Sequence, residues 1–264
     1  MSSLELNPDE YPWKIEAQVV GYGKLDPKEH MVFDHENARG VDYSGRILKQ
    51  FGAVGCRFEH CRFDKMRIGD FSYGAGRETS QYIECTFDRL RFGHGGGLAR
   101  FVRCSFKDVD IRGWCSYKTE FIDCVFTGRL RTSIFYGTVP EEDRPWVGRE
   151  KNEFQGNDFS GAELIDVAFR TGIDLERQRL PSGPDYLYIP DAPAAIERAK
   201  RGLADWMPGT ELQREALILV EVYGDTVENG QNQLIIHIPD YLKGPAKTPR
   251  ESVDKVVELF SRPS

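Results

Sequence analysis

Bulky apolar residues recur every five positions through the middle of this chain, a spacing that neither a helix nor an ordinary strand produces. From residue 41 to residue 73, every fifth position is aromatic or aliphatic, and the position two places earlier is apolar except at Arg46. The spacing returns after short interruptions and last appears at Phe169. The clearest copies are FEHCRFDKMRI, YIECTFDRLRF, FVRCSFKDVDI and FIDCVFTGRLR, which begin at Phe58, Tyr82, Phe101 and Phe121.

Each five-residue unit is expected to form one side and one corner of a coil. Because side chains alternate along a strand, the fifth residue and the residue two before it should point inward. The pattern therefore predicts a column of central rings at Phe63, Phe87, Phe106 and Phe126, and it continues inward through Arg131 and Tyr136.

The position two before the central ring is usually cysteine. A slot near a corner needs a small apolar side chain, and a buried thiol serves as one. We therefore expect a ladder of reduced thiols, without disulfides and without a metal site. The members of this ladder are Cys61, Cys85, Cys104 and Cys124.

These phrases resemble the pentapeptide-repeat proteins. DFSGAEL, at 158–164, is close to that family's consensus, and CRF, CTF, CSF and CVF match its cysteine-containing variant. The resemblance covers about half of the chain and implies a right-handed quadrilateral β-helix with four repeats per coil. The intervals of 19 and 20 residues between Tyr82, Phe101 and Phe121 agree with one coil per phrase. At about 4.8 Å per coil, five to seven coils give a rod of roughly 25–35 Å.

Three regions follow from where this pattern starts and stops. Residues 1–40 lack it and are interpreted as an N-terminal cap, in which KIEAQVVGYG reads as a strand. Residues 41–175 form the β-helix, interrupted by a loop insertion at 137–153. Residues 176–264 form a small, mostly α-helical region, which either caps the last coil or mediates dimerisation.

Apolar stripes at helical spacing predict three helices in this last region. They lie within 196–206, 212–223 and 253–260, and the third is expected to start with Thr248 as N-cap and Pro249 in the first position. NQLIIHIPDYL, at 232–242, fits either a strand or a short helix.

The charge balance argues against two classes of function, DNA mimicry and nucleic-acid binding. The chain carries a net charge of −7, but residues 41–174 contain 20 acidic and 20 basic residues, so the rod is neutral. The resemblance implies protection of type II topoisomerases by DNA mimicry, which needs dense acidic rows, and a neutral rod departs from that requirement. A neutral rod also lacks the net basic stripe of a nucleic-acid-binding surface. No apolar run is long enough to span a membrane, and the polar N-terminus is no signal peptide, so we expect a cytoplasmic protein.

Candidate catalytic chemistry is sparse. His94 precedes three glycines, as in a lipase oxyanion motif, but that motif needs a GxSxG elbow, and the chain has none. Glycines there are instead expected at a tight corner that requires positive φ. His60 and Cys61 are neighbours and should point to opposite sides of the coil wall. We therefore predict no catalytic, cofactor-binding or metal-binding residues.

The insertion at 137–153 is the candidate partner-binding loop, with Glu141, Glu142, Arg144 and Trp146 as its candidate residues. The alternative is a solvated loop whose tryptophan packs back on the rod. The resulting hypothesis is a non-enzymatic protein–protein interaction scaffold, with a homodimer through the C-terminal region left open and with no nucleic-acid or membrane partner. The alternative function is a resistance or immunity factor that protects DNA gyrase. An enzyme built on the C-terminal region is the third hypothesis.

Overall fold

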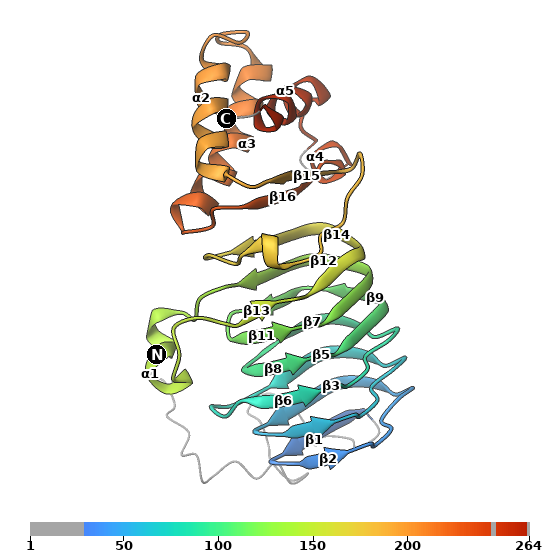
Figure 1. Cartoon of the computed structure of the whole chain (residues 1–264). Coiled ribbons are helices and arrows are strands. Elements are labelled where there is room, and N and C mark those ends of the chain that lie inside the picture. Colours follow the sequence, from blue (N-terminus) through green and yellow to red (C-terminus); the bar gives the residue numbers. More distant parts are fainter. Residues whose placement is uncertain (1–28, 244–246, 263–264) are drawn as a thin grey trace, which may run out of the picture.

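The computed structural model describes residues 29–243 and 247–262 and shows a rod of stacked strands with a helical subdomain at one end (Figure 1). The rod is a parallel β-solenoid of about five turns. Its first sheet has the order β1-β3-β5-β7-β10-β12-β14, with β9 paired to β7 and β12, and its second sheet has the order β13-β11-β8-β6-β4-β2. The predicted fold class, a β-helix followed by a small helical region, is confirmed.

The strands are short because each one forms only a side or two of a coil. The first sheet contains β1 (His30–Asp34), β3 (Ile47–Val54), β5 (Arg67–Gly74), β7 (Arg91–Gly97), β9 (Ser105–Arg112), β10 (Trp114–Ser116), β12 (Val125–Tyr136) and β14 (Asp158–Arg170). The second contains β2 (Asn37–Arg39), β4 (Arg57–Glu59), β6 (Ser80–Ile83), β8 (Ala99–Val102), β11 (Thr119–Ile122) and β13 (Phe154–Gln155).

Aromatic rings fill the axis of the rod in the predicted column. The ring centroids of Phe63 and Phe87 are 5.0 Å apart, those of Phe87 and Phe106 are 4.8 Å apart, and those of Phe106 and Phe126 are 5.0 Å apart. All three pairs are stacked with interplanar angles of 6–7°. The column continues to Phe159 at 4.5 Å. The prediction from the five-residue spacing is therefore confirmed.

The cysteine ladder is also present. All four thiols are buried, and each Sγ donates to a backbone carbonyl of the coil below, as Cys104 does to Tyr82 at 3.2 Å. Burial raises the pKa of the Cys104 thiol well above its ordinary value, so this thiol stays protonated. Asn157 continues the slot, because its side-chain oxygen accepts from the Cys124 amide and its Nδ2 donates to the Phe121 carbonyl.

The predicted inward positions Arg131 and Tyr136 are wrong by one residue. Leu130 and Phe135 are buried in their place, and the register between β9 and β12 shifts just before Gly128. This coil has one residue fewer at the corner, and Gly128 reaches across the gap with a φ of 92°. The five-residue count cannot detect such a deletion, because bulky residues occur on both sides of it.

Most of the glycines at 93–97 are not explained by the positive φ that the sequence predicted for them. Only Gly97 among them has a positive φ. Gly95 is the register partner of Trp114, which is fully buried, and a Cβ on Gly95 would lie 2.7 Å from the Phe92 ring. The Trp114 Nε1 donates to the Tyr73 hydroxyl at 2.8 Å, although β7 lies between the strands that carry these two residues. A large side chain in one coil thus stands in register with a glycine in the coil beneath it.

The stacked coils extend past both ends of the predicted range 41–175. β1 pairs with β3 and β2 pairs with β4 at an offset of 20 residues, so residues 30–39 belong to a coil and not to a cap. At the other end, Asp158 bridges Arg179, and η3 (Leu175–Arg177) lies within a further partial coil. The strand predicted near Trp13 lies outside the described residues.

The C-terminal subdomain packs three helices around an antiparallel strand pair. α2 (Ala192–Ala204), α3 (Glu211–Glu228) and α5 (Arg250–Ser261) bury most of the predicted stripes. Trp206, which follows the end of α2, is partly buried against the same core. β15 (Tyr186–Ile189) pairs with β16 (Leu234–His237), and α4 (Pro239–Lys243) follows, so the undecided segment is strand first and helix second. Thr248 does not cap α5. Pro249 occupies the cap position without a side-chain hydrogen bond, because the helix begins one residue later than predicted.

The subdomain covers the open edge of the last coil with side-chain oxygens. The Gln231 Oε1 accepts from the Gly172 and Ile173 amides at 3.1 and 3.0 Å. Further acceptors are the Gln233 amide oxygen for Leu175, the Asp240 carboxylate for Asp166 and the Tyr186 hydroxyl for Leu164. These oxygens replace the carbonyls that another coil would supply, so the edge is not left open to pair with another chain.

We expect Gln231→Ala to lower the free energy of unfolding by about 2 kcal/mol, because two backbone amides of the last coil lose their acceptor. Chemical denaturation followed by circular dichroism measures this. Gln213→Ala removes a side chain that bonds the Gly209 amide and the Leu203 carbonyl at the exposed turn between α2 and α3, so this control should cost less. Equal costs for the two variants would contradict the capping role.

Candidate functional site

The insertion at 137–153 is a folded projection. Thr138 and Lys151 form an antiparallel bridge at its neck, and the Val139 amide donates to Glu150. Its outer part consists of η2 (Glu141–Asp143) and α1 (Arg144–Val147), which lie beside the rod in Figure 1. The chain therefore presents a short, fixed helical element at this point.

Trp146 lies half-buried on this projection. Its Nε1 donates to the Asp143 carboxylate at 3.2 Å, and the Lys118 ammonium lies 4.6 Å from the ring centroid. Lys118 also forms an ion pair with Asp143 at 3.1 Å. The tryptophan packs back on the rod, as one of the two hypotheses predicted. Lys118 was missed, because no sequence pattern connects it to a residue 28 positions later.

The other predicted loop residues are spread around this core. Glu141 and Glu142 are exposed, and the Arg144 Nε donates to the Val139 carbonyl at 3.1 Å. The structure thus brings Trp146 together with Asp143 and Lys118, and not with the two glutamates.

A charged network holds the base of the projection. The Arg149 Nη2 donates to the Lys118 carbonyl at 2.9 Å, and its Nε lies 3.6 Å from the buried Glu120 carboxylate. Glu120 pairs with Arg100 at 3.0 Å, and Arg100 pairs with Glu153 at 2.6 Å. Burial lowers the pKa of the Arg149 guanidinium, although the Glu120 carboxylate opposes this. Arg149 holds the projection in place, because moving its guanidinium away would leave the buried Glu120 carboxylate with fewer partners.

An uncharged stripe runs up the face of the rod that leads to this projection. Its residues follow one another in register on successive strands, and none carries a charge. They are Val32, Gly52, Ser72, Gly96, Cys115, Ile134 and Ala168. A hollow of about 420 Å³ interrupts the stripe, with glycines of β5 and β7 on one side and Cys115, Tyr117 and Lys118 on the other.

Aromatic residues stand beside this hollow. Tyr117 is 43% exposed, and its ring stacks on Tyr136 at 4.2 Å. Lys118 lines the hollow and also covers Trp146, so the hollow and the projection form one continuous surface. We call this combination the stripe-and-loop surface. Sequence reasoning missed it, because its members come from seven strands.

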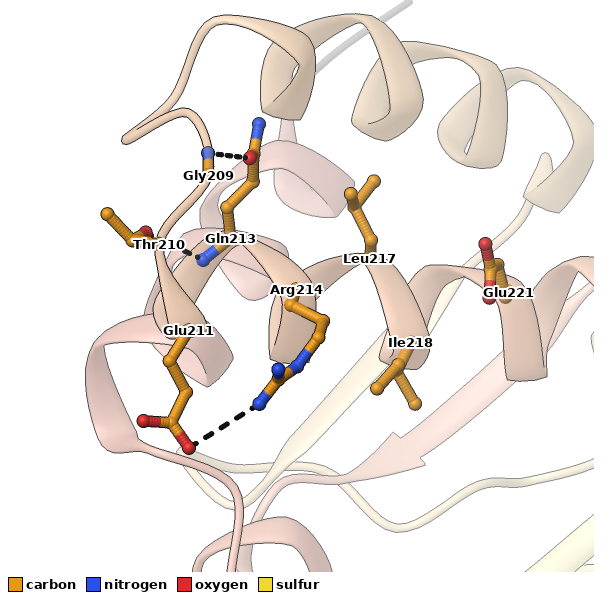
Figure 2. A pocket seen from close by; sticks show the side chains of 8 residues that line it. All are labelled: Gly209, Thr210, Glu211, Gln213, Arg214, Leu217, Ile218 and Glu221. Atoms are coloured by element: carbon orange, nitrogen blue, oxygen red, sulfur yellow. Dashed lines mark hydrogen bonds and ion pairs between the residues drawn. The ribbon is translucent and has the colours of Figure 1, made fainter.

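A second candidate surface lies on α3. A hollow of about 370 Å³ lies at its N-terminal half. Figure 2 shows the residues that line it, with Leu217 and Ile218 near the Glu211–Arg214 ion pair. Ile218 is 44% exposed, and Val222, one turn later, is 52% exposed. Two neighbouring β-branched residues on the outer side of a helix form a small unpartnered apolar patch.

Two histidines bear on catalysis. His60 is exposed and lies 3.1 Å from the Glu84 carboxylate, whereas Cys61 is buried, so the two residues point apart as predicted. The His237 Nδ1 lies 2.7 Å from Asp240, which also accepts from the Asp166 amide. This pair belongs to the junction between the subdomain and the rod. Within residues 29–243 and 247–262, His, Cys, Asp and Glu side chains form no group of three or more that could hold a metal.

None of the helices in the described ranges combines the length and apolarity that crossing a bilayer requires. No protein-family model matches the chain, and the search of curated proteins finds no similar sequence.

Proposed function

We propose that this protein is a pentapeptide-repeat protein that acts in the cytoplasm as a non-enzymatic scaffold and binds a partner protein through the stripe-and-loop surface. The observation that carries the proposal is the uncharged stripe beside Tyr117 and Trp146. The cores of protein interfaces are depleted in charge and enriched in tyrosine and tryptophan. A surface that is flat, rigid and uncharged along the rod fits a preformed docking site.

The charge arrangement favours this function over DNA mimicry of a type II topoisomerase substrate. Residues in register on the second sheet mix positive, neutral and negative side chains, as in Arg57, Gln81, Arg100 and Glu120. Arg57 forms an ion pair with Glu59 and Arg100 forms one with Glu120. Such rows do not present the continuous negative charge of a phosphate backbone.

The test is a quantitative affinity capture with the immobilised full-length protein. A Tyr117→Ala/Trp146→Ala variant should lose the proteins that the wild type retains, because both rings leave the stripe-and-loop surface. Tyr188→Ala, which removes an exposed tyrosine of the subdomain, is the matched control and should retain them. If the double variant captures the same proteins as the wild type, the surface is not the docking site.

Self-association through α3 is the second proposal for a partner. In an antiparallel pair of α3 helices, Ile218 of each copy would meet Val222 of the other, and Arg214 would lie opposite Asp225. Such an arrangement is self-complementary, as a twofold interface requires. We expect Ile218→Glu to shift a dimer to monomer in sedimentation velocity, while Arg201→Glu at an exposed position of α2 serves as the control. A wild type that is monomeric at high concentration would contradict this proposal.

A further inference from the structure

Two arginines on the rod lie directly beside each other, and the described residues give neither of them an ion pair. Arg67 and Arg91 begin β5 and β7 and are partners in the register of these neighbouring strands. Both are exposed, and neither has an ion pair within the described residues. Like charges directly opposite on adjacent strands are destabilising. The stability of the fold therefore does not explain why these two arginines lie side by side.

Several other arginines of the rod are compensated. Arg57 pairs with Glu59, Arg103 with Glu84, and Arg100 with two glutamates. Asp110, which follows Arg91 in register, is taken by Arg129 and Arg131 at 3.0 and 2.6 Å. Arg67 and Arg91 do not take part in these ion pairs.

The surroundings add positive charge. Lys65 and Arg89 lie two residues before the two arginines, and both are exposed without an ion pair in the described part of the chain. On the other side lie Gly69 and Gly93, and a Cβ added to Gly93 would lie 3.5 Å from the Gly69 carbonyl oxygen. Arg112 follows Ile111, the register partner of Phe92, and is also exposed.

The nearby carboxylates form no ion pair with these basic side chains within the described residues. The Asp64 carboxylate accepts from the Asp88 amide at 3.0 Å and pairs with Arg62. The Asp88 carboxylate accepts from the Lys107 amide at 2.9 Å and from the Ser105 hydroxyl. Asp70, Asp88 and Asp108 form no ion pair in the described part of the chain. We call Lys65, Arg67, Arg89, Arg91 and Arg112 the basic row.

We propose that the basic row binds an acidic segment of a partner protein. Guanidinium groups bind carboxylates through paired hydrogen bonds, and adjacent arginines favour a run of acidic residues over a single one. A nucleic acid fits less well, because the rod as a whole is neutral and the chain has a pI near 5.4. The neutral total of the rod conceals this local concentration of positive charge.

This inference deepens the proposed scaffold function, because it names the chemistry of a partner. The basic row lies at the start of β5 and β7, just before these strands and at the end of β9, whereas the stripe-and-loop surface lies beyond Asp70 and His94. The two sites can therefore be tested separately, and the failure of one leaves the other standing.

The experiment measures fluorescence anisotropy of a labelled deca-glutamate peptide with the full-length protein at low and at physiological salt. We expect Arg67→Gln/Arg91→Gln to weaken binding about tenfold, which corresponds to the loss of charge-assisted hydrogen bonds. Arg170→Gln/Arg177→Gln removes two exposed arginines from elsewhere on the chain and should leave binding unchanged. The thermal midpoint of the first variant should be equal to or above that of the wild type, because like-charge repulsion is relieved.

Three results would overturn the proposal. One is a wild type that does not bind the peptide. Another is equal weakening by the two double variants, which would indicate non-specific attraction. The third is tighter binding of a 20-base-pair DNA duplex than of the peptide, which would assign the basic row to phosphates. The Tyr117→Ala/Trp146→Ala variant should bind the peptide like the wild type, so this assay does not depend on the stripe-and-loop surface.

Discussion

Replacing Trp114 with alanine is expected to lower the free energy of unfolding by about 3–5 kcal/mol, the range for truncating a buried aromatic residue. The ring is fully buried and contacts aromatic rings in several coils, among them Phe92, Phe106 and Phe121. The glycines beneath it cannot fill the cavity, because they have no side chains to move. Guanidinium denaturation followed by far-ultraviolet circular dichroism measures the loss.

Two further variants separate the contributions of Trp114. Trp114→Phe keeps a ring but removes the donor to the Tyr73 hydroxyl, and it should cost about 1–3 kcal/mol. Trp146→Ala removes a half-buried ring from the projection and should cost about 1 kcal/mol or less. If Trp114→Ala costs no more than Trp146→Ala, Trp114 does not occupy the axis as described.

The second large effect is expected at Gly128, where the coil is one residue short. An added Cβ would lie 2.3 Å from the Val109 carbonyl oxygen and 2.6 Å from its nitrogen, and φ is 92°. Backbone atoms of a neighbouring strand cannot move aside without breaking the ladder. We expect Gly128→Ala to cost about 2–5 kcal/mol, from left-handed strain and from overpacking together. Denaturant titration again provides the measurement.

Gly148 is the matched control for this prediction. It also has a left-handed φ, of 76°, but no atom lies within 4 Å of an added Cβ. Gly148→Ala should therefore cost only the conformational strain, about 1–2 kcal/mol. The difference between the two variants measures the contact with Val109, and no difference would show that the coils can separate at this corner.

The sequence predicted the features of the fold that repeat from coil to coil. The column from Phe63 to Phe126 and the cysteine ladder follow from side chains of one size at one interval. Trp114 breaks this rule, because a large residue stands where a small one is expected and glycines in another coil compensate. The pattern within one coil does not show that a large residue there is compensated by a small one in another coil. The shift at Gly128 was missed for a related reason, since a one-residue deletion is visible only once the strands are aligned.

The candidate sites were less predictable than the fold. Trp146 was identified as a candidate because it lies in the insertion, but its partners Lys118 and Asp143 depend on how the insertion folds back. The basic row escaped for another reason. Counting charges over 41–174 gives an even balance, and the outward residues of one coil alternate in sign. Only the register between β5 and β7 places Arg67 next to Arg91 and shows which acidic groups are already taken.

The subdomain closes the rod in a way that does not depend on how long the rod is. Gln231, Gln233 and Asp240 bond amides of the final coil alone, so they would meet the same partners whether the rod had three turns or ten. A duplication or loss of one coil in the interior would therefore leave the end seal intact. In such a protein, evolution can change the reach of the molecule in steps of one coil without redesigning how it ends.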